Sequence, residues 1–258
     1  MLLTLKNDFE VKSKMDVNYL IIGNGKMAKH FCCYLEYLKI PYLHWYRNLS
    51  KEKLAEYQNQ STHILFLISD SSIDQFIEDN CLPHKKDKQT FVHFSGALIS
   101  KYAYTAHPLQ SFAKDLYSAE EYLDIYFGIE NEGPEFNLLL PKLSNRYFKI
   151  NQKDKPYYHA LGAIANNFTT LLWQKYFDTL EERFNLPSQV AIPLFEQTLK
   201  NIKSDYANAL TGPIARNDLK TIDMHLKTLK AENDSFLNIY QAFVDTFLKD
   251  TSSLIKGD

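Results

Sequence analysis

The chain has 258 residues, of which 45% are hydrophobic and 23% are charged, and its formal net charge is −2. This balance is typical of a globular protein with one large or two smaller domains. The near-neutral charge excludes proteins that depend on a strongly basic surface, so we expect no nucleic-acid partner. No apolar run reaches the roughly 18–20 residues of a membrane-spanning helix, so we expect no membrane partner.

Three cysteines, Cys32, Cys33 and Cys81, form neither a disulfide framework nor a metal-binding spacing. Their pattern predicts a cytoplasmic protein without a structural metal. Residues 1–16 lack the apolar region of about 7–15 residues that a signal peptide requires. We therefore interpret residues 1–16 as an N-terminal extension.

The most informative stretch is 17–28, which reads VNYLIIGNGKMA. A short apolar strand leads into Gly23, Gly25 and Ala28, the dinucleotide-binding pattern G-x-G-x-x-G/A, and then into a helix. Gly23 permits a sharp turn, Gly25 lets a pyrophosphate approach the backbone, and the helix N-terminus faces the anion. The predicted cofactor contacts are Gly23, Asn24, Gly25, Lys26 and Met27. A strand–helix turn without a ligand is the alternative.

The second predicted strand, 41–46, indicates which dinucleotide is bound. An acidic residue at the end of this strand would favour NAD, whereas an arginine accommodates the 2′-phosphate of NADP. The sequence has no Asp or Glu there, and Arg47 can grip a phosphate through two hydrogen bonds. We therefore predict NADP(H), with Arg47, Asn48 and Ser50 as contacts. A solvated polar loop is the alternative.

Further strands are predicted at 64–68, 91–94, 102–106, 124–129 and 147–150. Ligands of open α/β sheets bind beyond the carboxyl ends of the strands. Four residues that follow such ends are therefore predicted cofactor contacts, namely Ser69, Asp70, Ser95 and Gly96. His107 also ends a strand on this side, and we predict that it contacts the substrate.

At Lys155-Pro156 the pattern changes from mixed to helical. Helices are predicted at 156–184, 188–203, 218–231 and 234–256. The sequence thus predicts an α/β fold, a Rossmann-type doubly wound and mostly parallel sheet, followed by an all-helical C-terminal domain. The expected domains are the NADP-binding domain at 17–153 and the helical substrate and dimerisation domain at 154–258.

One face of the first long helix carries a candidate catalytic set, Lys155, His159 and Asn166, with Gly162 between them. Lys155 and His159 are about 6 Å apart along the helix axis and could share one small substrate. Reduction of a C=O group needs a proton on oxygen, which a Lys or His can supply. Purely structural roles for these polar residues are the alternative.

A second polar stretch, 211–218, reads TGPIARND. Its glycine and proline define a turn, and Asp218 can cap the next helix. Arg216 could bind a substrate carboxylate through two hydrogen bonds. A structural ion pair with Asp218 is the alternative.

The chain resembles the Rossmann-like proteins with a DUF2520 C-terminal domain, relatives of pyrroline-5-carboxylate, ketopantoate and 6-phosphogluconate-type dehydrogenases. The matching pieces are Gly23-x-Gly25-x-x-Ala28, residues 93–97 (HFSGA), 107–112 (HPLQSF), 158–160 (YHA) with Asn166 or Asn167, and 211–216 (TGPIAR). The resemblance implies a Rossmann domain, a helical second domain, NADP(H) use and a homodimer formed through the C-terminal helices. Some relatives carry Lys-x-x-x-Asn where this chain has Lys155-x-x-x-His159.

We expect an NADPH-dependent reductase of a small 2-oxo acid, with ketopantoate as the first candidate carboxylate substrate. Hydride would come from the nicotinamide and the proton from a lysine or histidine. Imine reduction, as in pyrroline-5-carboxylate reductase, is the second hypothesis, because an iminium is already protonated. A non-catalytic NADP(H) sensor is the third, since a fold alone does not determine function.

Overall fold

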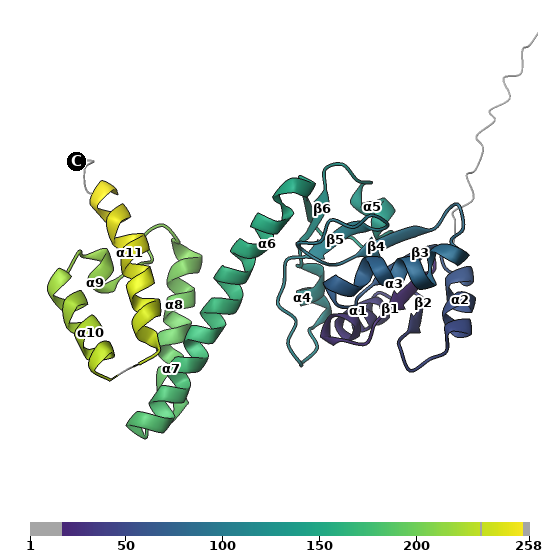
Figure 1. Cartoon of the computed structure of the whole chain (residues 1–258). Helices are drawn as coiled ribbons and strands as arrows, with labels where there is room; N and C mark the ends of the chain where they lie inside the picture. Colours follow the sequence, from purple (N-terminus) through teal and green to yellow (C-terminus); the bar gives the residue numbers. More distant parts are fainter. Residues whose placement is uncertain (1–16, 233, 255–258) are drawn as a thin grey trace, which may run out of the picture. The chain divides into compact units, whose positions relative to one another are not determined.

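The computed structural model describes residues 17–232 and 234–254 (Figure 1). The predicted extension at 1–16 lies outside the described residues. The chain forms two compact units, Met1–Leu171 and Leu172–Asp258, which are treated separately below. The first unit therefore extends past residue 153 and includes the first helix of the predicted helical region.

The first unit is built on a seven-stranded sheet with the order β2-β1-β3-β4-β5-β6-β7. Its strands are β1 (Tyr19–Ile22), β2 (Tyr42–Trp45), β3 (His63–Phe66), β4 (Thr90–His93), β5 (Tyr104–Pro108), β6 (Phe127–Glu130) and β7 (Tyr147–Ile150). Strands β1 to β5 pair in parallel, β6 runs antiparallel to β5, and β7 is parallel to β6. The predicted doubly wound, mostly parallel sheet is confirmed.

Alternate side chains of β1 enter two separate cores. Tyr19 and Ile21 pack on one face of the sheet, whereas Leu20 and Ile22 pack on the other, and all four are fully buried. A strand that is apolar on both faces has to lie inside a sheet covered on both sides. This burial explains the continuous apolar run before Gly23.

Helices cover both faces of the sheet (Figure 1). The first face packs against α1 (Lys26–Tyr37), α4 (Ala119–Leu123) and α5 (Phe136–Leu139), and the second against α2 (Lys51–Gln60) and α3 (Ile73–Asn80). Short 3₁₀ turns lie at Asp70–Ser72, Leu82–His84 and Gln152–Asp154. The strand–turn–helix unit predicted at residues 17–28 is therefore present, and Ala28 of α1 is fully buried.

After β7 the chain enters α6 (Lys155–Ala163), which runs beside β5. Lys155 contacts Thr105 near the start of β5, and the rings of His159 and His107 lie 5.8 Å apart near its end. The predicted helix at 156–184 is interrupted by a π-helical segment, Ile164–Phe168, before α7 (Thr169–Phe184). Such segments often occur at functional sites.

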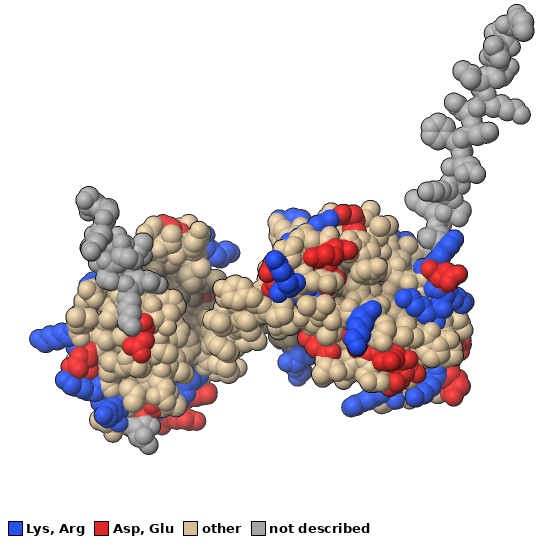
Figure 2. Space-filling model, turned by 45° about the horizontal axis from the view of Figure 1, so that its top comes forward, with Lys and Arg blue, Asp and Glu red and all other residues tan. Residues whose placement is uncertain are grey.

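The second unit is all helical among its described residues, as predicted. It contains most of α7, then a 3₁₀ turn (Ser188–Ala191), α8 (Ile192–Ser204), α9 (Gly212–Ala215), α10 (Leu219–Ala231) and α11 (Phe236–Leu254). None of the described helices is both long and apolar enough to cross a membrane. On the face drawn in Figure 2, basic and acidic side chains are interspersed over the first unit.

Candidate functional site

The glycine elbow between β1 and α1 lies at the carboxyl edge of the parallel strands. Gly23 has φ of 130°, and a β-carbon on it would lie 2.1 Å from the Leu67 carbonyl oxygen. Only glycine fits this conformation and this close approach to the end of β3. The His44 Nε2–H group donates to the Gly23 carbonyl over 2.6 Å and fixes the turn from the β2 side.

Gly25 serves a different purpose, because the space around it is open. Apart from Gly25 itself and its chain neighbours, no described atom lies within 4 Å of a β-carbon built on Gly25. Gly25 is the N-cap of α1, no described side chain caps this helix start, and its first turn has no acidic residue. The exposed N–H groups and the positive end of the helix dipole therefore fit a pyrophosphate. Asn24 and Lys26 are exposed at the same elbow, and Met27 is half-buried.

The loop after β2 places Arg47 and Asn48 on the surface next to this elbow, since β2 pairs with β1. Ser50 has a structural role that sequence reasoning missed: it is the N-cap of α2, and its hydroxyl accepts a hydrogen bond from the Lys53 N–H over 3.2 Å. Arg47 is thus the strongest candidate to hold a 2′-phosphate.

The loops after β3 and β4 are joined to each other at the same edge. The Ser95 hydroxyl donates to the Asp70 carboxylate. It also accepts from the backbone N–H groups of Ala97 and Leu98, over 3.3 and 3.0 Å. Ser69 is the N-cap residue of the 3₁₀ turn that contains Asp70. The structure therefore brings the predicted contacts Ser69, Asp70, Ser95 and Gly96 to the edge that also carries the glycine elbow.

A cavity of about 330 Å³ opens beside this edge. Its lining includes His107 from the end of β5, Tyr158 and His159 from α6, and Asn166 from the π-helical segment. Among the described lining residues there is no Lys, Arg, Asp or Glu. Gly96 lies against two of these side chains: a β-carbon on it would be 2.5 Å from His159 Cδ2 and 2.9 Å from His107 Nε2.

Two side chains that line this cavity, His107 and Tyr158, have shifted pKa values and are uncharged near neutral pH. Burial lowers the pKa of His107 to about 4, and the nearby His159 and Lys155 add to the effect. Burial raises the pKa of Tyr158. His107 Nδ1 and the Tyr158 hydroxyl are hydrogen-bonded over 3.1 Å. A neutral imidazole is therefore hydrogen-bonded to a protonated phenol, a contact that the sequence did not predict.

Lys155 and His159 do not line the same cavity, although the sequence predicts that they could share a substrate. The side chain of Lys155 is only 1% exposed. Its ammonium forms an ion pair with Glu130 over 2.7 Å and donates to the Thr105 hydroxyl and the Leu98 carbonyl oxygen. All three ammonium hydrogens thus have acceptors inside the protein.

The buried carboxylate of Glu130, which forms the ion pair with Lys155, is ionised. Burial of Glu130 opposes its charge, but the hydrogen bonds from Lys155 and Thr105 outweigh this effect and lower its pKa. Burial lowers the pKa of Lys155, and its contact with Glu130 works against that shift. A buried charged pair of this kind is costly to break, because removing one partner leaves the other uncompensated.

Arg216, the predicted carboxylate ligand, lies in the second unit. It is exposed directly after α9, and its positive charge contributes to lowering the pKa of Asp218. Asp218 caps α10 by accepting from the Thr221 N–H over 3.1 Å. The predicted turn and cap at 211–218 are therefore both present.

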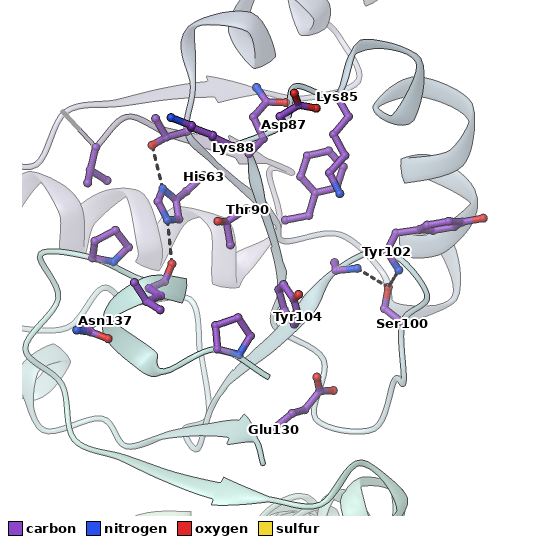
Figure 3. A pocket seen from close by; sticks show the side chains of 18 of the residues that line it. His63, Lys85, Asp87, Lys88, Thr90, Ser100, Tyr102, Tyr104, Glu130 and Asn137 are labelled. Carbon is purple, nitrogen blue, oxygen red and sulfur yellow. Dashed lines mark hydrogen bonds between the residues drawn. The ribbon is translucent and has the colours of Figure 1, made fainter. Parts of the chain in front are cut away.

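A larger cavity, of about 760 Å³, lies at the opposite edge of the sheet. Figure 3 shows its wall, with Thr90 and Tyr104 from the amino ends of β4 and β5 and with the Glu130 side chain. Ligands of doubly wound sheets bind at the carboxyl ends of the strands. This larger cavity is therefore at the wrong edge for a dinucleotide, and the glycine elbow and the smaller cavity are the candidate functional site.

Comparisons with known proteins agree with this geometry. Residues 125–246 match the family model "Domain of unknown function (DUF2520)". No curated protein matches the sequence. Among solved structures, protein TM1727 from Thermotoga maritima is 26% identical with a TM-score of 0.64, and the alignment covers 92% of this chain and 100% of that one.

Two further structures share the fold at lower identity. BF3122 from Bacteroides fragilis, provisionally described as an NADP oxidoreductase, is 20% identical with a TM-score of 0.73, over 91% of this chain and 98% of that one. Plasmodium falciparum pyrroline carboxylate reductase, solved with NADP bound, is 13% identical with a TM-score of 0.53, over 93% and 98%. The resemblance indicated by the sequence motifs is confirmed: the chain carries a DUF2520 match over residues 125–246 on a Rossmann-type fold shared with these proteins.

Proposed function

We propose that the protein is an NADPH-dependent reductase of a small carbonyl compound. The observation that carries this proposal is the open helix start at Gly25, which no described side chain caps and where an added β-carbon would meet open space. Arg47 next to this elbow favours the 2′-phosphate form of the dinucleotide. The relatives described as NADP-binding have the same fold. Bound there, the nicotinamide cofactor supplies a hydride.

The protein's own contribution is to bind the substrate and supply a proton in the cavity beside Gly96. Tyr158 keeps its phenolic proton near neutral pH, and its hydroxyl is hydrogen-bonded to His107 Nδ1. His159 and Asn166 line the same cavity and can donate hydrogen bonds to a carbonyl oxygen. We assign Tyr158 and His159 as the candidate proton donors and Asn166 as a substrate contact.

The substrate class we favour is a 2-oxo acid, and ketopantoate is the first compound to test. A cavity of about 330 Å³ matches a small substrate. Its lining among the described residues has hydrogen-bonding groups but no cation, so the substrate carboxylate needs a partner from elsewhere. Arg216 stays our candidate carboxylate ligand by its chemistry alone, because a guanidinium binds a carboxylate through two hydrogen bonds.

Imine reduction is the second candidate, and the burial of Lys155 favours it. With Lys155 in an ion pair with Glu130, the cavity holds no lysine among its described lining residues. A C=O group needs an added proton, whereas an iminium reaches the site with its proton in place. The pyrroline carboxylate reductase with the same fold fits this chemistry.

The test is NADPH oxidation by the purified protein with a panel of 2-oxo acids and a panel of cyclic imines. We expect turnover with a 2-oxo acid, and a loss of about 100-fold in kcat in Tyr158→Phe or His159→Ala, typical of a missing proton donor. Turnover of imines alone, unaffected by these changes, would support the second candidate. Tight NADPH binding without any turnover would identify a cofactor sensor instead.

We also propose that the protein forms a homodimer through its second unit. Large apolar side chains of α8 are strongly exposed, among them Leu194 at 55%, Leu199 at 51% and Ile202 at 50%. Large apolar side chains that are exposed together on one helix are typical of a protein interface. The three free cysteines, two of them buried, support a reducing and thus cytoplasmic environment.

A further inference from the structure

We propose that Lys155 is a positioning residue, whose ammonium ties the loop after β4 to the first turn of α6 and so sets the spacing between Gly96 and the His159 ring. This inference rests on the proposed function, since it concerns the same site. It replaces the role of proton donor that the sequence suggests for Lys155.

The ammonium joins three separate parts of the fold. Lys155 is the first residue of α6, the Leu98 carbonyl oxygen belongs to the loop between β4 and β5, and Thr105 and Glu130 stand on β5 and β6. Thr105 also donates to Glu130 over 2.7 Å, so the ion pair is fixed by the sheet itself. The loop after β4 and the first turn of α6 are therefore both anchored at the buried ammonium of Lys155.

The loop is fastened on its other side as well. The His93 Nε2–H group donates to the Thr105 hydroxyl over 3.0 Å, and His93 Nδ1 accepts from the Ser95 N–H over 3.2 Å. Ser95 in turn holds Asp70 at the cofactor edge. One continuous set of hydrogen bonds thus runs from the ammonium of Lys155 to the loop after β3.

The position of Gly96 is the consequence of these bonds. Gly96 lies between Ser95 and Leu98, both of which are held by these bonds. A β-carbon on Gly96 would lie 2.5 Å from the ring of His159, which is one helical turn beyond Lys155. A shift of about 1 Å in a positioned group can cost about 100-fold in rate. Lys155 therefore acts on the reaction through distance, without touching the substrate.

The experiment compares four proteins: the wild type, Lys155→Met, Glu130→Gln and the double variant. Each single change leaves one buried charge uncompensated, and we expect a fall of about 10- to 100-fold in kcat. The double variant has no uncompensated charge, so we expect it to recover about tenfold of the kcat lost in Lys155→Met. A proton-donating lysine could not be recovered in this way.

A geometric measurement accompanies the kinetics. We expect a strong nuclear Overhauser effect between the Gly96 α-protons and the His159 ring in the wild type, weaker in Lys155→Met and partly restored in the double variant. The matched control is Lys149→Met, which removes an exposed ion pair with Glu135 and should change neither the kcat nor the Overhauser effect.

Two outcomes overturn the proposal: a double variant no more active than Lys155→Met beside a fully active Glu130→Gln, or an unchanged Overhauser effect in Lys155→Met. If Lys155→Met does not fold, Thr105→Val removes the shared hydroxyl without removing a charge, and it should weaken the same Overhauser effect. If the wild type turns over no substrate, the proposed function fails, but the Overhauser measurement still tests the positioning role.

Discussion

Gly96 and His159 approach so closely that a β-carbon on Gly96 would lie 2.5 Å from the His159 ring. Gly96→Ala should therefore push the ring away from its place in the cavity. Because His159 is exposed and can rotate, we expect the variant to fold, at a cost of about 1–3 kcal/mol. We expect kcat/KM to fall by about 100-fold. Steady-state kinetics with parallel thermal unfolding would measure both, and unaltered kinetics would contradict the assigned site.

The two glycines of the elbow should respond in opposite ways to alanine. Gly25→Ala meets no described atom within 4 Å, so it should leave stability nearly unchanged but lower the affinity for NADPH by about tenfold or more, because the new methyl group occupies the approach of the pyrophosphate. Gly23→Ala should destabilise the first unit, because its φ is positive and its β-carbon would meet the Leu67 carbonyl oxygen.

Calorimetric titration with NADPH and thermal unfolding of both variants check this pair. Equal affinity of Gly25→Ala and wild type for NADPH would show that the elbow does not hold the pyrophosphate.

Arg47→Asp tests the choice of dinucleotide. The change replaces the group that would bind a 2′-phosphate by one that repels it but accepts from a 2′-hydroxyl. We expect the affinity for NADPH to fall by about 100-fold while that for NADH stays similar or rises. Titrations with both cofactors measure this, with Lys51→Asp as a neighbouring exposed control. Equal losses for both cofactors would contradict the assignment.

The buried His93 and the partly buried His107 should make the first unit sensitive to acid. Burial, with the charge of Lys155, lowers the pKa of His93 to about 4, and burial lowers that of His107 equally far. Between pH 6.5 and 4 the unfolded chain binds protons that the folded chain refuses, so stability is complete above about pH 6.5 and falls as the pH drops. Each histidine contributes at most about 1.4 kcal/mol per pH unit.

Urea unfolding at pH 7 and pH 5 measures this effect. Trp45 lies in the first unit and Trp173 in the second, so a Trp173→Phe background reports the first unit through Trp45 alone. In this background His93→Gln should show a smaller loss of stability at pH 5, whereas the exposed-histidine control His84→Gln should not. An identical loss in both variants would exclude His93 as a source.

The proposed dimer depends on the apolar face of α8. Leu199→Glu places a charge on a side chain that is 51% exposed, so it should leave the helical fold intact but disrupt a dimer formed there. Light scattering over a range of protein concentrations would show a monomer in this variant and a dimer in the wild type. A wild-type protein that stays monomeric at high concentration contradicts the proposal.

The sequence was sufficient to predict the sheet and the glycine elbow, because both have local causes. Fully buried parallel strands need continuous apolar runs, and the run before Gly23 shows this. The contribution of Gly23 was also local, since its φ is dictated by the sharp turn. The role of Ser50 as a helix cap was missed, although it also has a local cause, because a serine before a helix is a common N-cap.

The buried ion pair of Lys155 could not be predicted from the sequence. Helical spacing correctly groups His159, Gly162 and Asn166 around one cavity. Lys155 fits the same spacing, but its partner Glu130 lies 25 residues earlier in the sequence, on strand β6. The contact between His107 and Tyr158 spans 51 residues and was missed for the same reason. Local periodicity determines which side chains share a helix face, whereas the tertiary fold determines what each one meets.

The reversed direction of β6 has a consequence for how this chain can vary. Because β6 and β7 run against β5, the chain leaves the sheet at the amino edge, and α6 returns along β5. Four helical residues rise about 6 Å and two strand residues about 6.6 Å, so the step from Lys155 to His159 matches the step from Thr105 to His107. Inserting or deleting one residue within 155–159 would put helix and strand out of step, so the number of residues there is constrained more strictly than their identities.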